Sequence, residues 1–139
     1  HSYKGRTPRT DVMFGHAGYS YVYFTYGMHY CCNVVTGKEG EGSAVLIRAV
    51  EPIVGEEHMS QLRNKTGIDI CNGPAKLCKA LAIDTQLNGH NLENNPLTLQ
   101  LEDPIGNDAI TQTTRVGITK AVDKLWRFYI TNNPYVSKP

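Results

Sequence analysis

The sequence predicts an α+β fold: a single domain built on a mostly antiparallel, curved β-sheet with a few short helices. Three observations lead to this prediction. Short segments with strand-like composition recur along the chain, two stretches have helical spacing, and strands and helices do not alternate regularly. The length of 139 residues and an apolar content of 40% suit one domain with one core, residues 1–139.

The strongest strand prediction is the aromatic stretch YSYVYFTYGMHYCCN, residues 19–33. Tyr19, Tyr21 and Tyr23 alternate with other residues, so on a strand their rings share one face. A second apolar run follows at 30–35, which predicts a hairpin, or a strand and its bent continuation, whose tip is the intervening segment, Tyr26 to His29. The tyrosine face is either a packed surface or a platform on which bases stack.

The remaining elements follow in chain order from local signals. Residues 1–18 and 36–42 are punctuated by glycine and predict a loop and a turn, and the polar segments 84–95 and 103–107 predict a loop and a turn as well. Helices are expected over 56–63 and from Pro74 onward, and the predicted strands cover 44–50, 97–101, 114–118 and 127–131. The side chains expected to point inward are Met59, Leu62, Leu77, Cys78, Leu81, Trp126 and Phe128.

Composition limits the classes of partner. The formal net charge is only +1, but the first ten residues carry Lys4, Arg6 and Arg9 and no acid, which makes a small basic arm. No apolar run approaches the roughly 20 residues of a membrane helix, so we expect no membrane partner and an intracellular location, the nucleoid or the nucleus according to the organism. The four cysteines form no CxxC pair and predict buried thiols, with no metal or cofactor.

Two polar residues interrupt apolar strands and need partners. Arg48 in AVLIRAV must meet a carboxylate, a ligand or water, and Asn33 must bind either a neighbouring backbone group or a ligand. Tyr26 at a glycine turn is either an ordinary half-exposed ring or a side chain that fills a gap in a duplex. The helix start at Gly73, with Lys76 close by, suits a phosphate or is simply a solvated face. Together these features indicate a nucleic-acid protein that handles one base at a time.

Over nearly its whole length the chain resembles the alkyladenine (3-methyladenine) DNA glycosylase family. The stretches that carry the resemblance, in order, are HS, TPR followed by MF, YVYFTYGMHYCCNV, AVLIRAVEP, QLR, CNGPAKLCKALAI, RVGI and WRFYITNNPYVS. The resemblance implies a fold that is also similar to the C-terminal domain of formyltransferases. It further implies that alkylated or deaminated purines such as 3-methyladenine, hypoxanthine and ethenoadenine are flipped from double-stranded DNA and released by N-glycosidic hydrolysis, by a monomer without a cofactor.

The resemblance also implies roles for individual residues. Tyr26 matches the tyrosine that occupies the space left by the flipped nucleotide, with Met28 beside it at the DNA surface. Asn33 matches the asparagine that disfavours the 2-amino group of guanine, and Arg48 matches the arginine that holds the attacking water. His1 and Tyr23 match the residues that enclose the base. Cys31 is expected in the same pocket, and further DNA contacts are expected at Arg6, Thr7, Met13, Gly73 and Lys76.

One expected residue does not occur in these 139 residues. The family's general base is a Glu about eleven residues before the matching His, in a Glu-Ala-Tyr segment, and this chain starts at that His, His1. We therefore expect the sequence to be part of a longer protein. The alternatives are a module that binds lesions or single strands without hydrolysing them, and a metabolic transferase or interaction domain that shares the sheet but not the DNA surface.

Overall fold

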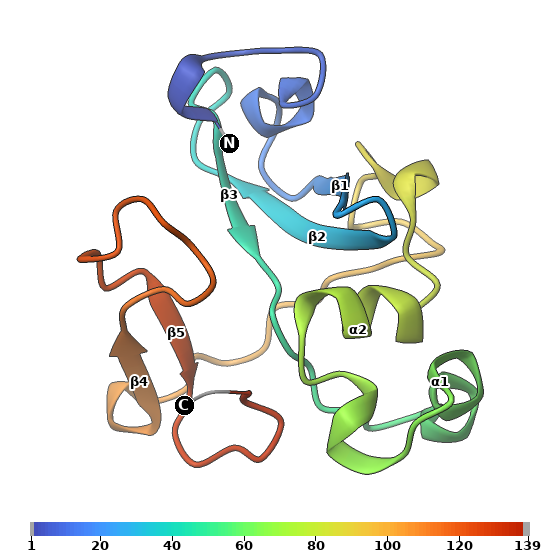
Figure 1. Ribbon diagram of the computed structural model, residues 1–139. Coiled ribbons are helices and arrows are strands. Elements are labelled where there is room, and N and C mark those ends of the chain that lie inside the picture. The colour runs from blue at the N-terminus through green and yellow to red at the C-terminus, as the bar shows by residue number, and fades with distance from the viewer. Residues whose placement is uncertain (1, 138–139) are drawn as a thin grey trace.

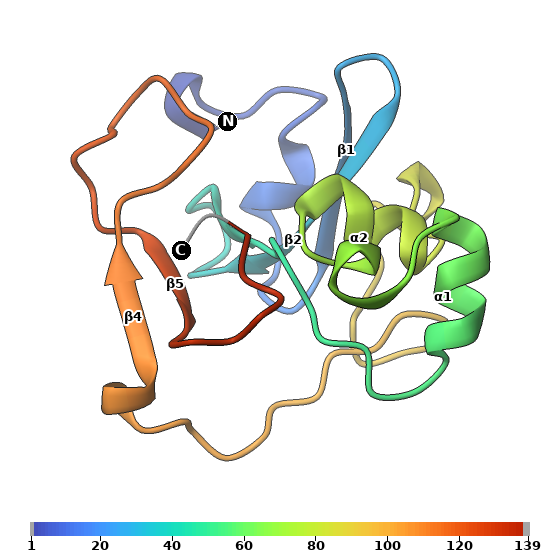
Figure 2. The same ribbon diagram turned by 60° about the horizontal axis from the view of Figure 1, so that its bottom comes forward.

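The computed structural model describes residues 2–137 and shows two antiparallel sheets and two α-helices (Figure 1), which confirms the α+β prediction. The larger sheet has three strands in the order β1-β2-β3, and the smaller sheet pairs β4 with β5. The strands are β1 (Ser20–Thr25), β2 (His29–Thr36), β3 (Ser43–Leu46), β4 (Ile110–Thr113) and β5 (Arg127–Ile130). The helices α1 (Glu56–Arg63) and α2 (Pro74–Ala80) lie on the far side of the molecule from β4 and β5 in both views (Figures 1 and 2).

The predicted hairpin of aromatic residues is confirmed. β1 and β2 pair antiparallel, with Thr25 opposite His29. Between them, Tyr26 and Gly27 both have positive φ, 52° and 68°, and the Met28 N–H donates to the Thr25 carbonyl over 3.3 Å. Two consecutive residues in the left-handed region match the right-handed twist of the flanking strands, which is why such turns join hairpins tightly. The tip therefore holds Tyr26 in a backbone conformation that aromatic residues rarely adopt.

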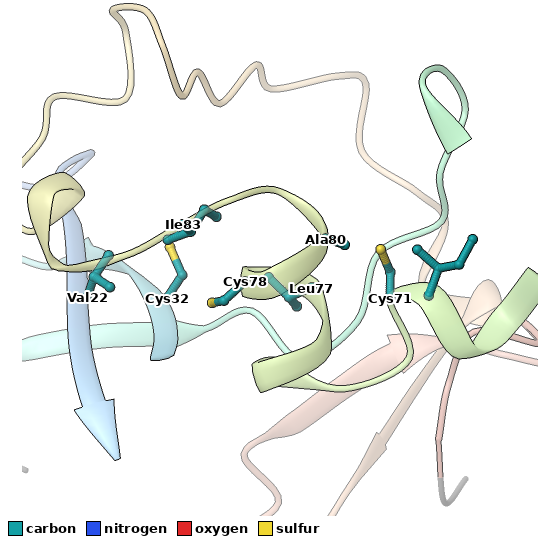
Figure 3. Packing of buried hydrophobic residues seen from close by; sticks show 8 residues of the cluster. Val22, Cys32, Cys71, Leu77, Cys78, Ala80 and Ile83 are labelled. Carbon is teal, nitrogen blue, oxygen red and sulfur yellow. The ribbon is translucent and has the colours of Figure 1, made fainter. Parts of the chain in front are cut away.

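The β1–β2–β3 sheet packs on both faces. One face meets α2, where Val22 and Cys32 pack with side chains gathered around the helix (Figure 3), including Leu77, Cys78, Ile83 and Cys71. The opposite face packs Tyr21 and Val35 against Met13, which belongs to a short 3₁₀ turn at Asp11–Phe14. All four cysteines are free and buried, as predicted, and adjacent Cys31 and Cys32 lie on opposite faces of β2.

Helix α2 begins where the sequence predicts, with Gly73 as the N-cap residue and Pro74 at the first position. The burial of the side chains at its end differs from the prediction. The helix stops at Ala80, Ala82 takes a positive φ of 52°, and the Ile83 N–H donates back to the Cys78 carbonyl over 2.8 Å. This closure buries Ala80 and Ile83 and leaves Leu81 exposed, so the prediction that Leu81 points inward is wrong.

Helix α1 covers the residues predicted for it, and Met59 packs against the core from its partly buried position. The loop prediction for 84–95 holds apart from a short 3₁₀ turn at Thr85–Leu87. Other 3₁₀ turns cover Ser2–Lys4, Gly67–Ile70 and Asn107–Ala109. None of the helices within residues 2–137 combines the length and apolar character needed to span a membrane.

Three strand predictions need correction. The strand expected over 44–50 ends at Leu46, because the chain then turns and the Val50 N–H bonds the Cys71 carbonyl over 3.4 Å, beside the helices. Residues 97–101 form no strand, and Leu99 bonds the Leu92 carbonyl instead of a sheet neighbour. The strand expected over 114–118 is displaced to β4, at 110–113, where it pairs with β5.

The core assignment around β5 is also reversed. Trp126 and Phe128, predicted to be buried, are each 62% exposed, whereas Arg127 between them is only 7% exposed. Alternation along β5 sends Arg127 and Tyr129 to one face and Phe128 and Ile130 to the other. Trp126 and Phe128 are exposed because the face of β5 that carries Arg127 is the one that points toward the rest of the protein.

Candidate functional site

The register of the three-stranded sheet collects the predicted base-pocket residues on one face. Tyr21 lies opposite Asn33, and Tyr23 lies opposite Cys31. Because side chains alternate along a strand, these four residues point to the same side of β1 and β2, and we call this surface the aromatic face. Cys31 and Asn33 are buried in it, and Tyr23 is half-buried.

Asn33 is held by a backbone group. Its Nδ2 donates to the Tyr21 carbonyl over 3.0 Å, and the residue is 8% exposed. Of the two interpretations from sequence, the bond to a neighbouring backbone is therefore present. Its Oδ1 accepts no hydrogen bond from the residues that the structure describes. The bond fixes the orientation of the amide, which leaves an oriented acceptor beside Tyr21.

Arg48 follows β3 and reaches the same surface. The Ile47 N–H donates to the Cys32 carbonyl over 3.1 Å, so the residue before Arg48 is still bonded to β2. Arg48 is partly buried, and no carboxylate within residues 2–137 forms an ion pair with it. Burial lowers the pKa of its guanidinium, and the nearby charge of Arg127 lowers it further. The guanidinium still remains charged, because arginine ordinarily titrates far above neutral pH.

Arg127 is a second cation at this place, and the sequence did not single it out. It comes from β5 and is almost fully buried. Its guanidinium lies 4.7 Å from the centroid of the Tyr129 ring, and its Nη2 donates to the Ser137 carbonyl over 3.1 Å. The alternation Arg127, Tyr129 within a short strand was the signal that could have found it. A partly buried cation and a buried cation close to each other repel, so this place favours an anionic or polar group beside Arg48.

Tyr23 packs against the cluster of Met13, Tyr21 and Val35 and also has Cys31 and Arg9 as neighbours. Burial raises the pKa of its phenol well above the usual range, with Cys31 adding to the effect, so the hydroxyl stays protonated. The centroid of its ring lies 5.4 Å from that of the Tyr21 ring, and the angle between the two ring planes is 33°. The guanidinium of Arg9, from the N-terminal arm, lies 5.4 Å from the centroid of the Tyr23 ring. The sequence had placed Arg9 only in a basic arm.

The hairpin tip projects from this surface. Tyr26 is 85% exposed and Met28 is 70% exposed, although both are large apolar side chains. They lie in the turn that joins β1, the strand that carries Tyr23, to β2. Exposed apolar residues at a strained turn have no role in the core, so the tip is available for contact with another molecule.

The residues outside the hairpin that were predicted to contact DNA differ in their exposure and in their hydrogen-bond partners. Arg6 is exposed and paired with Asp11 over 2.5 Å, and the Thr7 N–H bonds the Thr10 hydroxyl over 3.0 Å. Met13 is a correction: its side chain is buried against Tyr21 and Val35, so it does not reach the surface.

The start of α2 is less open than the sequence suggested. Gly73 is buried there, and Lys76 is engaged by two neighbours, with its Nζ 3.2 Å from Asp69 Oδ1 and 2.5 Å from Asn72 Oδ1. Lys76 also holds the pKa of the exposed Asp69 carboxyl below its usual value. Contact of these residues with DNA stays a prediction.

His1 lies outside the residues that the structure describes, so its place beside the base is not assigned. Two open hollows lie elsewhere on the protein. One, of about 480 Å³, is bounded by α1 and the segment after it, from Ser60 to Asp69, and the other, of about 380 Å³, lies beside Tyr129 and Asn133. Neither is lined by the aromatic face. Within residues 2–137 no three His, Cys, Asp or Glu side chains are grouped to hold a metal ion.

Comparison with known proteins places the chain beside one family. The family model described as methylpurine-DNA glycosylase matches residues 1–134. A protein of Carboxydothermus hydrogenoformans is 51% identical over 140 residues, covering 99% of this chain and 73% of the relative. A protein of Francisella tularensis subsp. tularensis is 54% identical over 142 residues, and one of Methanoculleus marisnigri is 49% identical over 144 residues, each with 99% of this chain and 74% of the relative covered. All three bear the name "Putative 3-methyladenine DNA glycosylase".

Proposed function

Because the chain belongs to the methylpurine-DNA glycosylase family, we propose that it takes a damaged purine out of duplex DNA and hydrolyses its N-glycosidic bond. The proposed substrates are alkylated or deaminated purines: 3-methyladenine, hypoxanthine and ethenoadenine. One observation supports the proposal most directly. An exposed Tyr26 stands at the tip of the same hairpin that carries Tyr23 and Asn33, and Tyr23 lies near Arg48.

The hairpin separates two tasks. Tyr26 presents a ring at a rigid turn, which suits insertion into the gap that an extruded nucleotide leaves in the stack. Tyr23 offers a neutral aromatic surface for stacking, and the Asn33 amide, oriented by its bond to the Tyr21 carbonyl, offers polar contacts at the base edge. Flat stacking combined with edge contacts is what recognition of a single extruded base requires.

Arg48 is proposed to hold the attacking water. It lies near Tyr23 and Cys31, and it has no carboxylate partner within residues 2–137. Water attacks C1′ of the sugar as the purine departs through an oxocarbenium-like transition state. The proton of that water passes to a general base, which we propose is the Glu that the resemblance places before the position of His1.

Hydrolysis is tested with a version of the protein that carries a Glu-Ala-Tyr segment with its Glu eleven residues before His1. This version should release hypoxanthine from an inosine-containing duplex. Replacing Arg48 with Ala in it should lower the single-turnover rate by about 10²-fold or more, because positioned groups contribute on this scale. Lys79→Ala, which removes one charge from the exposed side of α2, should leave the rate unchanged.

Three outcomes decide between the proposals. Equal rates for the extended protein and its Arg48→Ala variant remove Arg48 from the mechanism. Binding of a lesion duplex over undamaged duplex, without any release by the extended protein, supports a binding module in place of a glycosylase. A lack of salt-dependent affinity for DNA contradicts both, since phosphate contacts weaken steeply with added salt.

A further inference from the structure

Arg9 connects the N-terminal arm to the aromatic face. Its guanidinium carbon lies 5.4 Å from the centroid of the Tyr23 ring, and its Nη2 donates to the Phe24 carbonyl over 3.3 Å. The same guanidinium approaches the phenol of Tyr21 and lowers its pKa, although burial of Tyr21 outweighs this and the net pKa is raised. One side chain thus contacts three residues of β1: Tyr21, Tyr23 and Phe24.

The backbone on either side of Arg9 is anchored. Thr7 and Thr10 bond each other through backbone and hydroxyl groups, with the Thr10 N–H 3.0 Å from the Thr7 carbonyl, and Thr10 is buried. Three residues later Met13 is buried beneath Tyr21. Arg9 is therefore presented from a fixed turn, and its place over the ring does not depend on the long side chain alone.

The charge of Arg9 is not neutralised locally. No acidic side chain within residues 2–137 forms an ion pair with it. Arginine over an aromatic face is attracted by the electron density of the ring and draws on it. A base that stacks on Tyr23 therefore stacks on a ring that already carries a cation.

We propose that Arg9 is a specificity-determining residue, which disfavours cationic purines relative to neutral ones because its guanidinium stays against the Tyr23 ring on which the base stacks. The inference rests on the proposed function, in which Tyr23 receives the base. Purines alkylated on a ring nitrogen such as N3 or N7 carry a positive charge in DNA, whereas hypoxanthine does not. Like charges on either side of one ring repel weakly, which corresponds to about a two- to fivefold loss of affinity at the surface of a protein.

Binding to non-cleavable duplexes tests this without requiring hydrolysis. Two duplexes of one sequence carry a 2′-fluorinated nucleotide, with 7-methylguanine as the cationic base or hypoxanthine as the neutral base. A third duplex is undamaged. The dissociation constants of the unmodified protein are compared with those of Arg9→Met and Arg9→Lys at one salt concentration, because affinities for DNA vary steeply with salt.

In Arg9→Met, affinity for the cationic lesion should rise about two- to fivefold relative to affinity for the neutral lesion. Arg9→Lys keeps the charge and should keep the original ratio within about twofold. The control is Arg6→Met, which removes one charge from the same arm but lies beside Asp11 instead of the ring. It should weaken binding of both lesions in step and leave their ratio unchanged.

The outcomes separate the two proposals. An unchanged ratio in a folded Arg9→Met, with lesions still bound more tightly than undamaged duplex, overturns the role of Arg9 alone. An equal change in Arg9→Met and Arg6→Met shows a general charge effect and also overturns it. If the unmodified protein binds all three duplexes equally, the proposed function is contradicted, and the inference falls with it.

Discussion

At the scale of a single residue, the role of Arg48 depends on the side chains around it. A charged side chain in an apolar strand has to meet an acid, a ligand or water, and sequence leaves all three open. In the structure its neighbours are Arg127, Cys31 and Tyr23, with no ion pair to an acid within residues 2–137. An acidic partner is therefore absent among residues 2–137, which is consistent with the proposed contact of Arg48 with a ligand or water.

The buried thiols of Cys32 and Cys78 should make the folded protein less stable at alkaline pH. Burial raises the pKa of Cys32 to about 11 and that of Cys78 to about 12, above the usual value near 8.5 for a thiol in the unfolded chain. The neutral thiols therefore stabilise the folded protein fully below about pH 8.5. This contribution is lost as the pH rises toward the folded values, because the unfolded chain releases protons first.

We predict that the melting temperature falls between about pH 8.5 and 10.5, corresponding to a loss of about 2 kcal/mol of unfolding free energy for each of the two thiols. Circular dichroism at fixed salt measures it. The variant Cys32→Ala/Cys78→Ala should be less stable at pH 7 but show a smaller decline, since Ala does not titrate. An equal decline in both proteins would assign the effect to the tyrosines and lysines instead.

Among the elements, the hairpin tip combines a destabilising backbone conformation with an exposed side chain that can contact another molecule. Tyr26 has φ of 52° at the first central position of the turn, where Asn or Asp is preferred because they adopt the left-handed conformation most easily. The ring is almost fully exposed, so packing within the protein does not offset this cost. A residue that is strained and exposed at once is best explained by an external partner.

Replacing Tyr26 with Asn should therefore raise the unfolding free energy by about 0.5–1 kcal/mol while weakening binding to a lesion-containing duplex. Thermal melting and fluorescence anisotropy measure the two effects. Tyr26→Phe is the matched control, because it keeps the ring and the turn strain and should keep most of the affinity. If Tyr26→Asn binds the lesion duplex as tightly as the unmodified protein does, the tip does not enter DNA.

Elements with strong local signals were predicted well. The Gly73–Pro74 start of α2, the acidic first turn of α1 and the alternation in β1 are properties of adjacent residues. The end of α2 was harder to predict. Burying Ile83 instead of Leu81 depends on how the chain turns after the helix, and that turn is stabilised by the core it joins.

The molecule as a whole is unevenly packed. The two clusters of buried residues involve β1, β2, α2 and the segment around Met13, and neither includes a residue of β4 or β5. The smaller sheet has only two strands, and Phe128 and Trp126 are exposed there. A two-stranded sheet with little buried apolar surface is only marginally stable by itself.

Hydrogen exchange should reveal this difference. Backbone amides of β1 and β2 are expected to exchange at least about 10-fold more slowly than those of β4 and β5, because opening the first pair disrupts the core and opening the second does not. Exchange followed by NMR at neutral pH measures it. Equal protection in the two sheets would show that the Asn133–Glu51 hydrogen bond and the buried Arg127 couple them into one cooperative unit.

The sequence by itself determined the family, the aromatic hairpin, both helices and the residues that line the aromatic face. These depend on alternation and on glycine and proline signals within one segment, together with a match over nearly the whole chain. The tertiary structure alone decided which weak strand-like segments pair and which charges meet. Residues 110–113 form β4 because they pair with β5, whereas residues 97–101 join neither sheet of the part that the structure describes.

Three arginines that are far apart in sequence lie near this surface. Arg9 belongs to the N-terminal arm, Arg48 follows β3, and Arg127 belongs to β5. Long-range packing places Arg9 over the Tyr23 ring and Arg48 near both Tyr23 and Arg127, because a local pattern sets which way a side chain points but not what it will face.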